Sequence, residues 1–500
     1  MTSTLLWTLI AAQVALGGFD TLYHHELTER LAWRPSQRRE LKLHGVRNLI
    51  YGALFAALGW SEVHGALAWA AIAFLAVEIV ITLADFVEED VSRKLPATER
   101  VTHTLLALNY GAILYALLPV LLGWAGQETG MVPAFHGAWS VLAAAAALGV
   151  AVFGLRDLAA SARAARLVPK PAAALVTALP RHRSILVTGA TGFVGARLVE
   201  GLTAAGHDVI VLTRKAEKAL ALRPPFRLVT DLEQIDGATR IDAIVNLAGE
   251  PVSGGLWTAA RKRAIVESRR SMVAGLLRLA ARLEQRPAVL VGASAIGWYG
   301  LRGDEELAED AAPARDFFSH DSCEIVERET AKARGLGLRV VALRIGLVLG
   351  TEGGLLARLL LPFEFGMGGR IGSGRQWMSW IARDDLVRLI AHAIANEELE
   401  GPVNATAPAP VRNADFARAL GHALHRPAAM PLPALPLRLL GAFGRELLLG
   451  GQRVVPRKAL ASGFAFAYPT LAMALESMLG AKPAREHVAR AEAAHRLRLG

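Results

Sequence analysis

The sequence predicts two structural classes in one chain: an all-α bundle of about five transmembrane helices, then an α/β domain with a doubly wound parallel sheet and a small α-rich C-terminal domain. Hydrophobic residues make up 53% of the 500 residues, and the mean hydropathy of +0.33 is high for a soluble protein. Long apolar segments are confined to the first third. Short apolar segments alternate with helical patterns over 184–345, which is typical of a parallel sheet covered on both faces.

Composition narrows the function classes. The formal net charge is +10, but the basic residues form no stripe interleaved with aromatic residues, so we expect no nucleic-acid partner. Much of the positive charge lies in short loops between apolar segments, where it sets the orientation of membrane helices. Cys323 is the only cysteine, which rules out an internal disulfide.

Five apolar segments of the first third are predicted to span a bilayer, and they run over 5–22, 47–60, 66–86, 101–124 and 138–155. Some are shorter than the usual ~20 residues, so the pattern is also compatible with four spans. Lysine and arginine are concentrated in 25–46, in 87–100 and after the last segment, whereas 61–65 and 125–137 contain neither. The positive-inside rule then places the N-terminus outside an inner or plasma membrane and the α/β part in the cytoplasm.

Histidines and carboxylates gather at the predicted cytoplasmic ends of these segments. Ionisable groups inside a bundle suggest a metal site or a proton relay. The candidate metal ligands are His24, His44, Glu78 and His103. The alternative is a set of ion pairs that lock the bundle, with Arg47 pairing to Asp85 or Glu78. We favour the ion pairs and predict no metal, because no tight ligand spacing such as HxxEH is present.

A glycine-rich stretch over 188–195 is the strongest motif in the chain. It follows an apolar run over 185–187 and precedes a helical pattern. Gly189 permits a tight turn, Gly192 allows a pyrophosphate to approach the backbone, and Gly195 allows the helix to pack on the strand. The helix N-terminus then faces the phosphates, as in a Rossmann-like dinucleotide site. The expected cofactor contacts in this stretch are Gly189, Thr191, Gly192, Phe193, Val194 and Gly195.

The residues that follow the second predicted strand, 209–212, indicate which dinucleotide binds. They are Thr213 and Arg214. NAD-specific proteins often place an acidic residue there for the ribose hydroxyl. This chain has Arg214, which suits a 2′-phosphate, so we predict NADP rather than NAD. The alternative is a solvated surface arginine.

Four further strands are predicted over 226–229, 241–246, 288–292 and 339–345. The strand over 241–246 runs into small residues at the carboxyl edge of the sheet, where ligands bind in open α/β folds. Leu247, Ala248 and Gly249 are therefore expected cofactor contacts. Glu250 is either a substrate contact or a cap of the next segment.

These pieces resemble the extended short-chain dehydrogenase/reductase superfamily, and within it an atypical, epimerase-like subfamily with a small C-terminal domain of unknown function. The resemblance covers about 184–480 and leaves out the membrane part. Its matching segments are 188–195, 212–214, 246–251, 294–300, 344–350, 372–380, 384–385, 401–407, 456–460 and 463–466. It implies an NAD(P)-dependent oxidoreductase or a sugar-nucleotide-epimerase-like enzyme.

The chain departs from the superfamily at the catalytic pair. Members usually carry Tyr-x-x-x-Lys beside a serine, with the tyrosine as proton donor. The soluble half contains only Tyr299 and Tyr468, and neither has a lysine four residues on. Ser319 and Cys323 align with the places of the pair. The resemblance leaves Ser294, in the serine position, and Tyr299 as catalytic candidates, with a packing or binding role for Tyr299 as the alternative.

A glycine-rich segment over 366–374 is followed by Arg375 and Gln376, and in the resembling folds this region lines the substrate pocket. We expect both residues to contact substrate; the alternative is a structural loop anchored by Trp377 and Trp380. Asp384 is predicted to cap a helix over 385–396. Amphipathic helices are expected over 437–449 and 469–479, and a basic helix over 485–499.

Four parts are therefore expected: a transmembrane domain over 1–157, a linker over 158–183, a nucleotide-binding domain over 184–410 and a domain closing the substrate cleft over 411–500. We expect a membrane-anchored, NADP-dependent oxidoreductase or epimerase-like protein acting on a small molecule, with the lipid bilayer as a partner. One alternative is an NADP-binding sensor without turnover. Another places the function in the bundle, with a metal at the histidines and NADPH as electron source.

Overall fold

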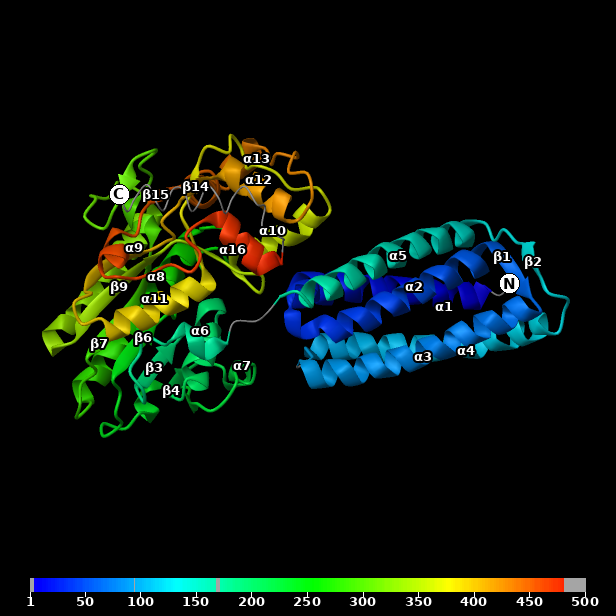
Figure 1. The fold of residues 1–500 in the computed structure, drawn as a ribbon, viewed down its shortest axis with the longest axis horizontal. Coiled ribbons are helices and arrows are strands. Elements are labelled where there is room, and N and C mark those ends of the chain that lie inside the picture. The colour runs from blue at the N-terminus through cyan, green and yellow to red at the C-terminus, as the bar shows by residue number, and fades with distance from the viewer. Residues whose placement is uncertain (1–3, 94, 168–170, 481–500) are drawn as a thin grey trace. The chain divides into compact units, whose positions relative to one another are not determined.

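The computed structural model describes residues 4–93, 95–167 and 171–480, which form two compact units, Met1–Val168 and Pro169–Gly500 (Figure 1). The predicted helix over 485–499 lies outside the described residues. The first unit is helical, and its long elements are α1 (Thr4–Phe19) continued by the π-helix η1 (Asp20–Glu29), α2 (Arg38–Trp60), α3 (Ala66–Ser92), α4 (Ala97–Ala125) and α5 (Ala138–Ala164).

Four helical segments among the described residues are long and apolar enough to cross a membrane, rather than the five spans expected. They are Thr4–Glu29, Ala66–Ser92, Ala97–Ala125 and Ala138–Ala164. The second expected span corresponds to α2, which is 23 residues long. Its first half carries Arg38, Arg39, Glu40, Lys42 and Arg47, so its composition differs from that of the other four.

Small residues bring α2 and α5 of the bundle together. A Cβ atom at Gly45 would lie 2.6 Å from Leu158 Cγ and 2.9 Å from the carbonyl oxygen of Gly154. The backbones therefore approach closely, as in small-residue helix interfaces. At the other end of α2, β1 (Ser61–His64) pairs antiparallel with β2 (Gly130–Pro133), which joins the two loops that lack lysine and arginine.

A parallel sheet forms the centre of the second unit, which confirms the predicted Rossmann-like class. The strand order is β13-β9-β7-β6-β3-β4-β5, and every neighbouring pair is parallel. The described strands are β3 (Ser184–Thr188), β4 (Asp208–Leu212), β5 (Arg227–Val229), β6 (Ala243–Asn246), β7 (Val289–Ala295), β9 (Arg339–Ile345) and β13 (Gly401–Ala405). Six of these were predicted as strands from their apolar runs. The seventh, β13, contains Pro402 and Asn404 and lacks such a run.

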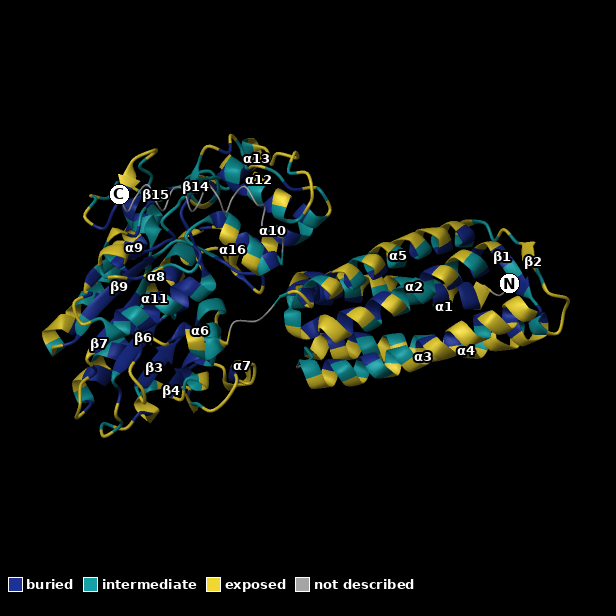
Figure 2. Cartoon of the chain, viewed as in Figure 1, coloured by how far each residue is buried: buried dark blue, intermediate teal, exposed yellow. Residues whose placement is uncertain are grey.

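Helices cover both faces of this sheet, whose strands are buried (Figure 2). On one face, α6 (Phe193–Ala204) and α11 (Arg383–Ala395) pack on residues such as Ile185 and Val187. On the other, α8 (Ala259–Arg282) packs on Leu186 and its neighbours. The alternation of side chains along β3 therefore separates two apolar layers.

The segment expected as a linker, 158–183, contributes to both units. Helix α5 continues through its first residues to Ala164. Further on, the short helix η4 (Ala172–Leu175) contacts α6, and Leu175, Val176 and Leu179 are buried in the same apolar layer as β3. This part of the segment is therefore packed into the α/β unit.

Two helix predictions near the C-terminus need correction. Asp384 does not cap α11, because the helix begins at Arg383, and the Asp384 carboxylate pairs with Arg197 on α6 at 3.1 Å. The helix expected over 437–449 is broken into α13 (Ala434–Arg438), α14 (Gly441–Phe443) and η8 (Gly444–Leu448), because Gly441 adopts a φ of 63°. The expected helix over 469–479 is present as α16 (Leu471–Leu479).

The remaining elements lie between or after the strands of the sheet. They are α7 (Ala216–Ala219), η5 (Leu232–Gln234), η6 (Ile296–Tyr299), β8 (Glu306–Leu307), α9 (Phe318–Ala331), η7 (Lys332–Leu336), β10 (Leu347–Leu349), α10 (Gly354–Glu364), β11 (Trp377–Met378), β12 (Trp380–Ala382), β14 (Val411–Arg412), α12 (Asn413–Ala423), β15 (Arg453–Val454) and α15 (Arg457–Ala461). Strand β15 pairs with β8, so the C-terminal part is attached to the α/β domain beside the carboxyl edge of β7.

Candidate functional site

The glycine-rich stretch forms the turn between β3 and α6, at the point where the strand order reverses between β3 and β6. Ligands of open α/β sheets bind at such a switch point, outside the carboxyl ends of the strands. Gly189 has a φ of 68°, and a Cβ there would lie 2.8 Å from the Ala248 nitrogen. A Cβ at Gly195 would overlap the Gly189 carbonyl oxygen. Both glycines are therefore required by the backbone alone.

Gly192 differs from these two glycines. It is exposed and has ordinary backbone angles, and a Cβ there would meet only the Gly189 carbonyl oxygen, at 3.1 Å. The space beyond it is open, as the approach of a pyrophosphate requires. Among the other expected contacts, Phe193 lies against Gly353 and Val194 packs on the apolar core, so their side chains point into the protein. Thr191 is half-buried.

The end of β6 is tied to the glycine turn. The Thr188 hydroxyl donates to Asn246 Oδ1 at 2.6 Å, and the Ala248 N–H donates to the same oxygen at 3.3 Å. Leu247 and Ala248 are half-buried and Gly249 is exposed, so all three border the switch point. These contacts hold the two loops in one arrangement.

Glu250 follows directly and is paired to α8. Its carboxylate accepts from Arg261 Nη1 at 2.6 Å, its N–H donates to the Ser268 hydroxyl at 3.0 Å, and its carbonyl oxygen accepts from Arg269. Burial lowers the pKa of Arg269. Glu250 thus fixes the loop onto α8, and its carboxylate remains partly exposed.

Arg214 lies where β4 ends, on the neighbouring strand. Its side chain is exposed and forms no ion pair with the described residues. The carboxyl ends of β3 and β4 are adjacent because their strands pair from Ser184–Asp208 to Thr188–Leu212. The guanidinium is therefore available beside the glycine turn.

The two catalytic candidates belong to one buried polar network. The Ser294 hydroxyl donates to Glu327 Oε1 at 2.7 Å, and Arg344 holds both oxygens of Glu327 at 2.9 Å. Arg344 also donates to the Tyr299 hydroxyl at 3.1 Å, which in turn donates to Asn404 Oδ1 at 2.7 Å. The Tyr299 side chain is fully buried, and burial raises its pKa.

This network supports the packing alternative for Tyr299, because its hydroxyl is committed on both sides. Of the two residues at the places of the usual catalytic pair, Ser319 is half-buried and hydrogen-bonded and Cys323 is buried. The Ser319 hydroxyl donates to Glu446 at 2.8 Å, and Cys323 is buried with its thiol pKa raised to about 11 by that burial. Ser294 keeps a half-buried position at the carboxyl end of β7.

The two expected substrate contacts of the glycine-rich segment are placed differently. The Gln376 amide donates to the carbonyl oxygens of Ile371 and Leu448, both at 3.1 Å, so it ties this segment to the C-terminal helices. Arg375 is exposed. The indole of Trp377 donates to Asp304 and that of the buried Trp380 to Ala409, as the structural alternative expects.

A cavity of about 520 Å³ lies beside this segment. Gln376 lines it together with residues from the C-terminal part, among them Arg438 and Arg445. Both arginines are exposed, so the cavity has a positive rim. An anionic ligand suits such a rim.

The candidate metal ligands of the bundle fall into two groups. His44 and His103 lie among other ligand-type side chains, in the sets His25–His44–Glu89 and Asp20–His25–Glu99–His103. His24 belongs to neither set, and both of its ring nitrogens are hydrogen-bonded, to Asp20 at 2.8 Å and to Thr98 at 3.2 Å. Glu78 accepts from Tyr51 and Thr82 and belongs to neither set.

Sequence reasoning did not nominate Asp20, His25, Glu89 and Glu99 as ligands. Asp20 and His25 were visible beside His24, and Glu89 lies one helical turn from Asp85. Glu99 lies one helical turn before the nominated His103 on α4, but no spacing connects either of them to residues of the other elements. The expected pairing of Arg47 with Asp85 is present at 2.8 Å.

Comparisons with known proteins match the second unit. The profile of the NAD dependent epimerase/dehydratase family matches residues 185–405, and a domain of unknown function, DUF1731, matches 432–478. The "Epimerase family protein SDR39U1" of Bos taurus is 40% identical over 304 residues, which are 59% of this chain and 99% of the relative. "Epimerase family protein YfhF" of Bacillus subtilis is 36% identical, covering 59% of this chain and 98% of the relative.

A solved structure is also similar. The crystal structure of human epimerase family protein SDR39U1 (isoform2) with NADPH is 32% identical, with a TM-score of 0.54, and covers 59% of this chain and 99% of that one. The first family match begins at residue 185 and the second at residue 432, so the helical unit lies outside both. The sheet, the glycine turn at its switch point and these matches lead to one conclusion: the chain belongs to the NAD dependent epimerase/dehydratase family.

Proposed function

We propose that the protein is a membrane-anchored, NADP-dependent oxidoreductase or epimerase-like protein. The observation that most directly supports NADP as the cofactor is the position of Arg214, whose guanidinium is exposed at the end of β4 beside the glycine turn. A cation at this place suits a 2′-phosphate. The similarity to a human protein crystallised with NADPH supports the same choice.

Within this proposal, the cofactor lies along the switch point. The glycine turn and the N-terminus of α6 face the pyrophosphate, and Leu247–Gly249 border the path toward β7. Ser294, at the end of β7, faces the reacting end. The substrate enters from the side of Glu250 and Arg375, and the arginine rim of the cavity beside Gln376 suits an anionic molecule.

The helical unit is the membrane anchor in this proposal. Its four apolar segments are long enough to span a bilayer, and large apolar side chains such as Leu108, Tyr115 and Val91 are more than two thirds exposed. The distribution of lysine and arginine places the N-terminus outside and the α/β unit in the cytoplasm. A protease added to sealed inside-out vesicles is expected to cleave the α/β unit, and the same protease added to intact cells is not. The reverse pattern contradicts this orientation.

The proposed activity is tested without assuming a substrate. Full-length protein in detergent micelles is incubated with 4-deuterated NADPH and small molecules extracted from cells, and products heavier by one deuterium are sought by mass spectrometry. We expect such a product with the wild type and none with Gly192→Val, which blocks the pyrophosphate approach. Tyr299→Phe is expected to retain the product, because the hydroxyl is buried in a structural network.

A second candidate function is an NADP-binding sensor without turnover. It is favoured by the hydrogen-bonded Ser319 and the buried Cys323, which leave no proton donor at the usual place. The same experiment separates the two. A net reduction gives a deuterated product, whereas an epimerase returns the hydride to its own substrate and gives an isomer of unchanged mass. Binding of NADPH with neither a deuterated nor an isomerised product above the Gly192→Val background supports the sensor and overturns the enzyme.

A further inference from the structure

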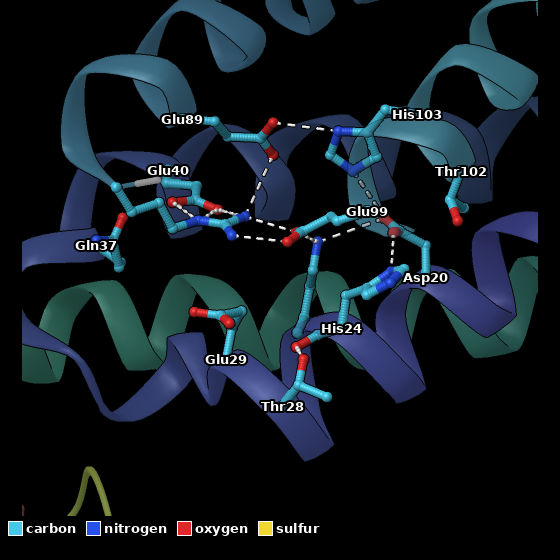
Figure 3. Close-up of polar contacts among 12 residues, drawn as sticks. Asp20, His24, Thr28, Glu29, Gln37, Glu40, Glu89, Glu99, Thr102 and His103 are labelled. Atoms are coloured by element: carbon cyan, nitrogen blue, oxygen red, sulfur yellow. Dashed lines mark hydrogen bonds and ion pairs between the residues drawn. The ribbon is translucent and has the colours of Figure 1, made fainter. Parts of the chain in front are cut away.

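A cluster of histidines and carboxylates is buried in the helical unit. We call it the bundle cluster, and its members are Asp20, His25, His44, Glu89, Glu99 and His103. They come from η1, α2, α3 and α4, so four segments converge on one place. Figure 3 shows the His103 ring between Glu89 and Asp20. His103 is the only member of this cluster that is not fully buried.

The polar atoms of this cluster are incompletely paired. His25 Nε2, His44 Nε2 and both carboxylate oxygens of Glu89 are buried and make no hydrogen bond. His25 is 7% exposed, His44 2% and Glu89 1%. Two of these residues have ion-pair neighbours, because His44 Nε2 lies 2.9 Å from Asp85 Oδ2 and Glu89 Oε2 lies 3.3 Å from His103 Nδ1. A buried polar atom that makes no hydrogen bond is costly, so His25 Nε2, which faces the carboxylates of Asp20 and Glu99, indicates a missing ligand.

The distances between the ligand-type atoms around His25 are compatible with an ion. His103 Nε2 is 3.2 Å from Asp20 Oδ2, and His25 Nε2 is 3.4 Å from the same oxygen and 3.6 Å from Glu99 Oε1. Charge-assisted hydrogen bonds are shorter, about 2.7–2.9 Å. Ligand atoms bound at about 2.0–2.2 Å are separated by about 3.3–3.6 Å around a tetrahedral ion and by about 2.8–3.1 Å around an octahedral one, so the three distances lie near these ranges.

The balance of charged side chains around the bundle cluster also favours a bound cation. Arg47 pairs with Asp85, and Arg93 lies 2.9 Å from Glu40 and 2.7 Å from Glu99. Each guanidinium offsets one carboxylate. When the histidines are neutral, the carboxylates exceed the two guanidiniums by three negative charges, and a divalent cation would offset most of this excess. These carboxylates are the five of Asp20, Glu40, Asp85, Glu89 and Glu99, all of which are buried.

Neighbouring side chains orient the ligand atoms. His24 Nδ1 bonds Asp20 Oδ1 at 2.8 Å, so the other oxygen, Oδ2, faces His25 and His103. Glu89 Oε2 lies 3.3 Å from His103 Nδ1, which leaves Nε2 for the ion. This carboxylate–histidine arrangement is typical of metal sites, where the outer carboxylate fixes the ring.

The backbone also departs from the ordinary helix at this point. Asp20, His24 and His25 lie in the π-helix η1, which ends at Arg30 with a φ of 54°. π-helical turns are rare and occur mostly at functional sites. A cavity of about 390 Å³ reaches Asp20, His25 and His103, and its walls include Phe86 and Leu106. The cavity gives an ion access to the cluster.

From this geometry we infer that the helical unit holds a divalent first-row transition-metal ion, bound by Asp20, His25, Glu99 and His103. Two imidazoles and two carboxylates suit such an ion. Glu99 accepts from Arg93 and still has lone pairs for the ion. His44, whose ring stacks on His25 at 4.7 Å, belongs to the alternative set with Glu89.

The test uses full-length protein in detergent micelles, stripped with a chelator and titrated with Co²⁺, whose visible absorption reports coordination. Metal content is measured independently by mass spectrometry. The variants are His25→Gln and Glu99→Gln, and the matched control is Glu78→Gln, which changes a buried carboxylate outside both sets. His44→Gln tests the alternative set. Circular dichroism and the Co²⁺-induced rise in melting temperature distinguish loss of binding from loss of the fold.

We expect one Co²⁺ per chain for the wild type and for Glu78→Gln. The dissociation constant is expected to rise at least ~10-fold in His25→Gln and in Glu99→Gln, with helicity retained. Absence of stoichiometric Co²⁺ in the wild type overturns the site and leaves an ion-pair lock. Equal weakening by Glu78→Gln overturns it as well. Loss of Co²⁺ binding in His44→Gln, with binding kept in Glu99→Gln, overturns the proposed set of four ligands in favour of the set with Glu89.

Discussion

The two units each bury a polar network, and the networks differ in how completely their atoms are paired. In the α/β unit, Ser294, Glu327, Arg344, Tyr299 and Asn404 form a chain in which one guanidinium meets one carboxylate and each hydroxyl has a partner. In the bundle cluster, His25 Nε2, His44 Nε2 and the Glu89 oxygens make no hydrogen bond.

The difference shows what a buried polar network is for. A fully paired network needs nothing further and specifies the packing around it. A network with atoms that make no hydrogen bond can take a further ligand, as proposed for the bundle cluster. In the α/β unit, Gly192 of the glycine turn and Arg214 are exposed, and of the network residues Ser294 is half-buried at the carboxyl end of β7.

Breaking the paired network gives the largest expected effect. Arg344→Met removes the cation from Glu327 and leaves its carboxylate without a charge partner. The free energy of unfolding of the α/β unit is expected to fall by ~3–5 kcal/mol, measured by urea denaturation of the full chain. Arg418→Met is the control, because the exposed Arg418 pairs with Asp415 at the surface, and we expect ~0–1 kcal/mol. Equal losses in both variants contradict a structural role of the network.

The glycine turn gives a smaller effect that separates folding from binding. Gly195→Ala forces a Cβ into the Gly189 carbonyl and is expected to lower the free energy of unfolding by ~1–3 kcal/mol. Gly192→Val is expected to change it by less than ~0.5 kcal/mol, because the site is exposed. The same Gly192→Val change is expected to weaken NADPH binding at least ~10-fold, measured by nicotinamide fluorescence. A valine at 192 that leaves binding intact places the dinucleotide elsewhere.

The smallest effect concerns the single thiol. Cys323 is buried, and burial raises its pKa to about 11, so the thiol is neutral at pH 8. A raised thiol pKa means that the reactive thiolate forms only as pH approaches that value. At pH 8, alkylation of Cys323 is therefore expected to be slow in the native protein and fast in the urea-unfolded chain. Fast native labelling at pH 8 means that Cys323 is accessible, against the structure.

Local patterns predicted those parts of the molecule that local physics determines. The glycine turn was visible because Gly189 adopts a positive φ within it and Gly195 is required by a contact with Gly189 in the same turn. Strand β13 was not, because Asn404 and Pro402 interrupt its apolar run, and its place beside β9 is set by tertiary pairing. Asp384 resembled a helix cap, but an arginine distant in the chain, Arg197, offered it an ion pair instead.

The candidate sites follow the same rule. Ser294 and Tyr299 were found from a motif, but their roles depend on Glu327, Arg344 and Asn404, which come from other elements. The bundle cluster combines side chains of four segments, and no spacing within one segment predicts that Glu99 meets His25. A sequence therefore shows which residues are chemically capable, and the fold decides which of them meet.

The most direct measurement is the affinity of the full-length protein for NADPH relative to NADH, in the wild type, in Arg214→Glu and in Arg278→Glu. Arg278 is exposed near the C-terminal end of α8, so it controls for the change of charge. We expect the wild type and Arg278→Glu to prefer NADPH, and Arg214→Glu to lose at least ~10-fold in NADPH affinity while its NADH affinity is retained. Equal affinity for both cofactors in the wild type, or an Arg214→Glu variant that still prefers NADPH, would contradict the assignment.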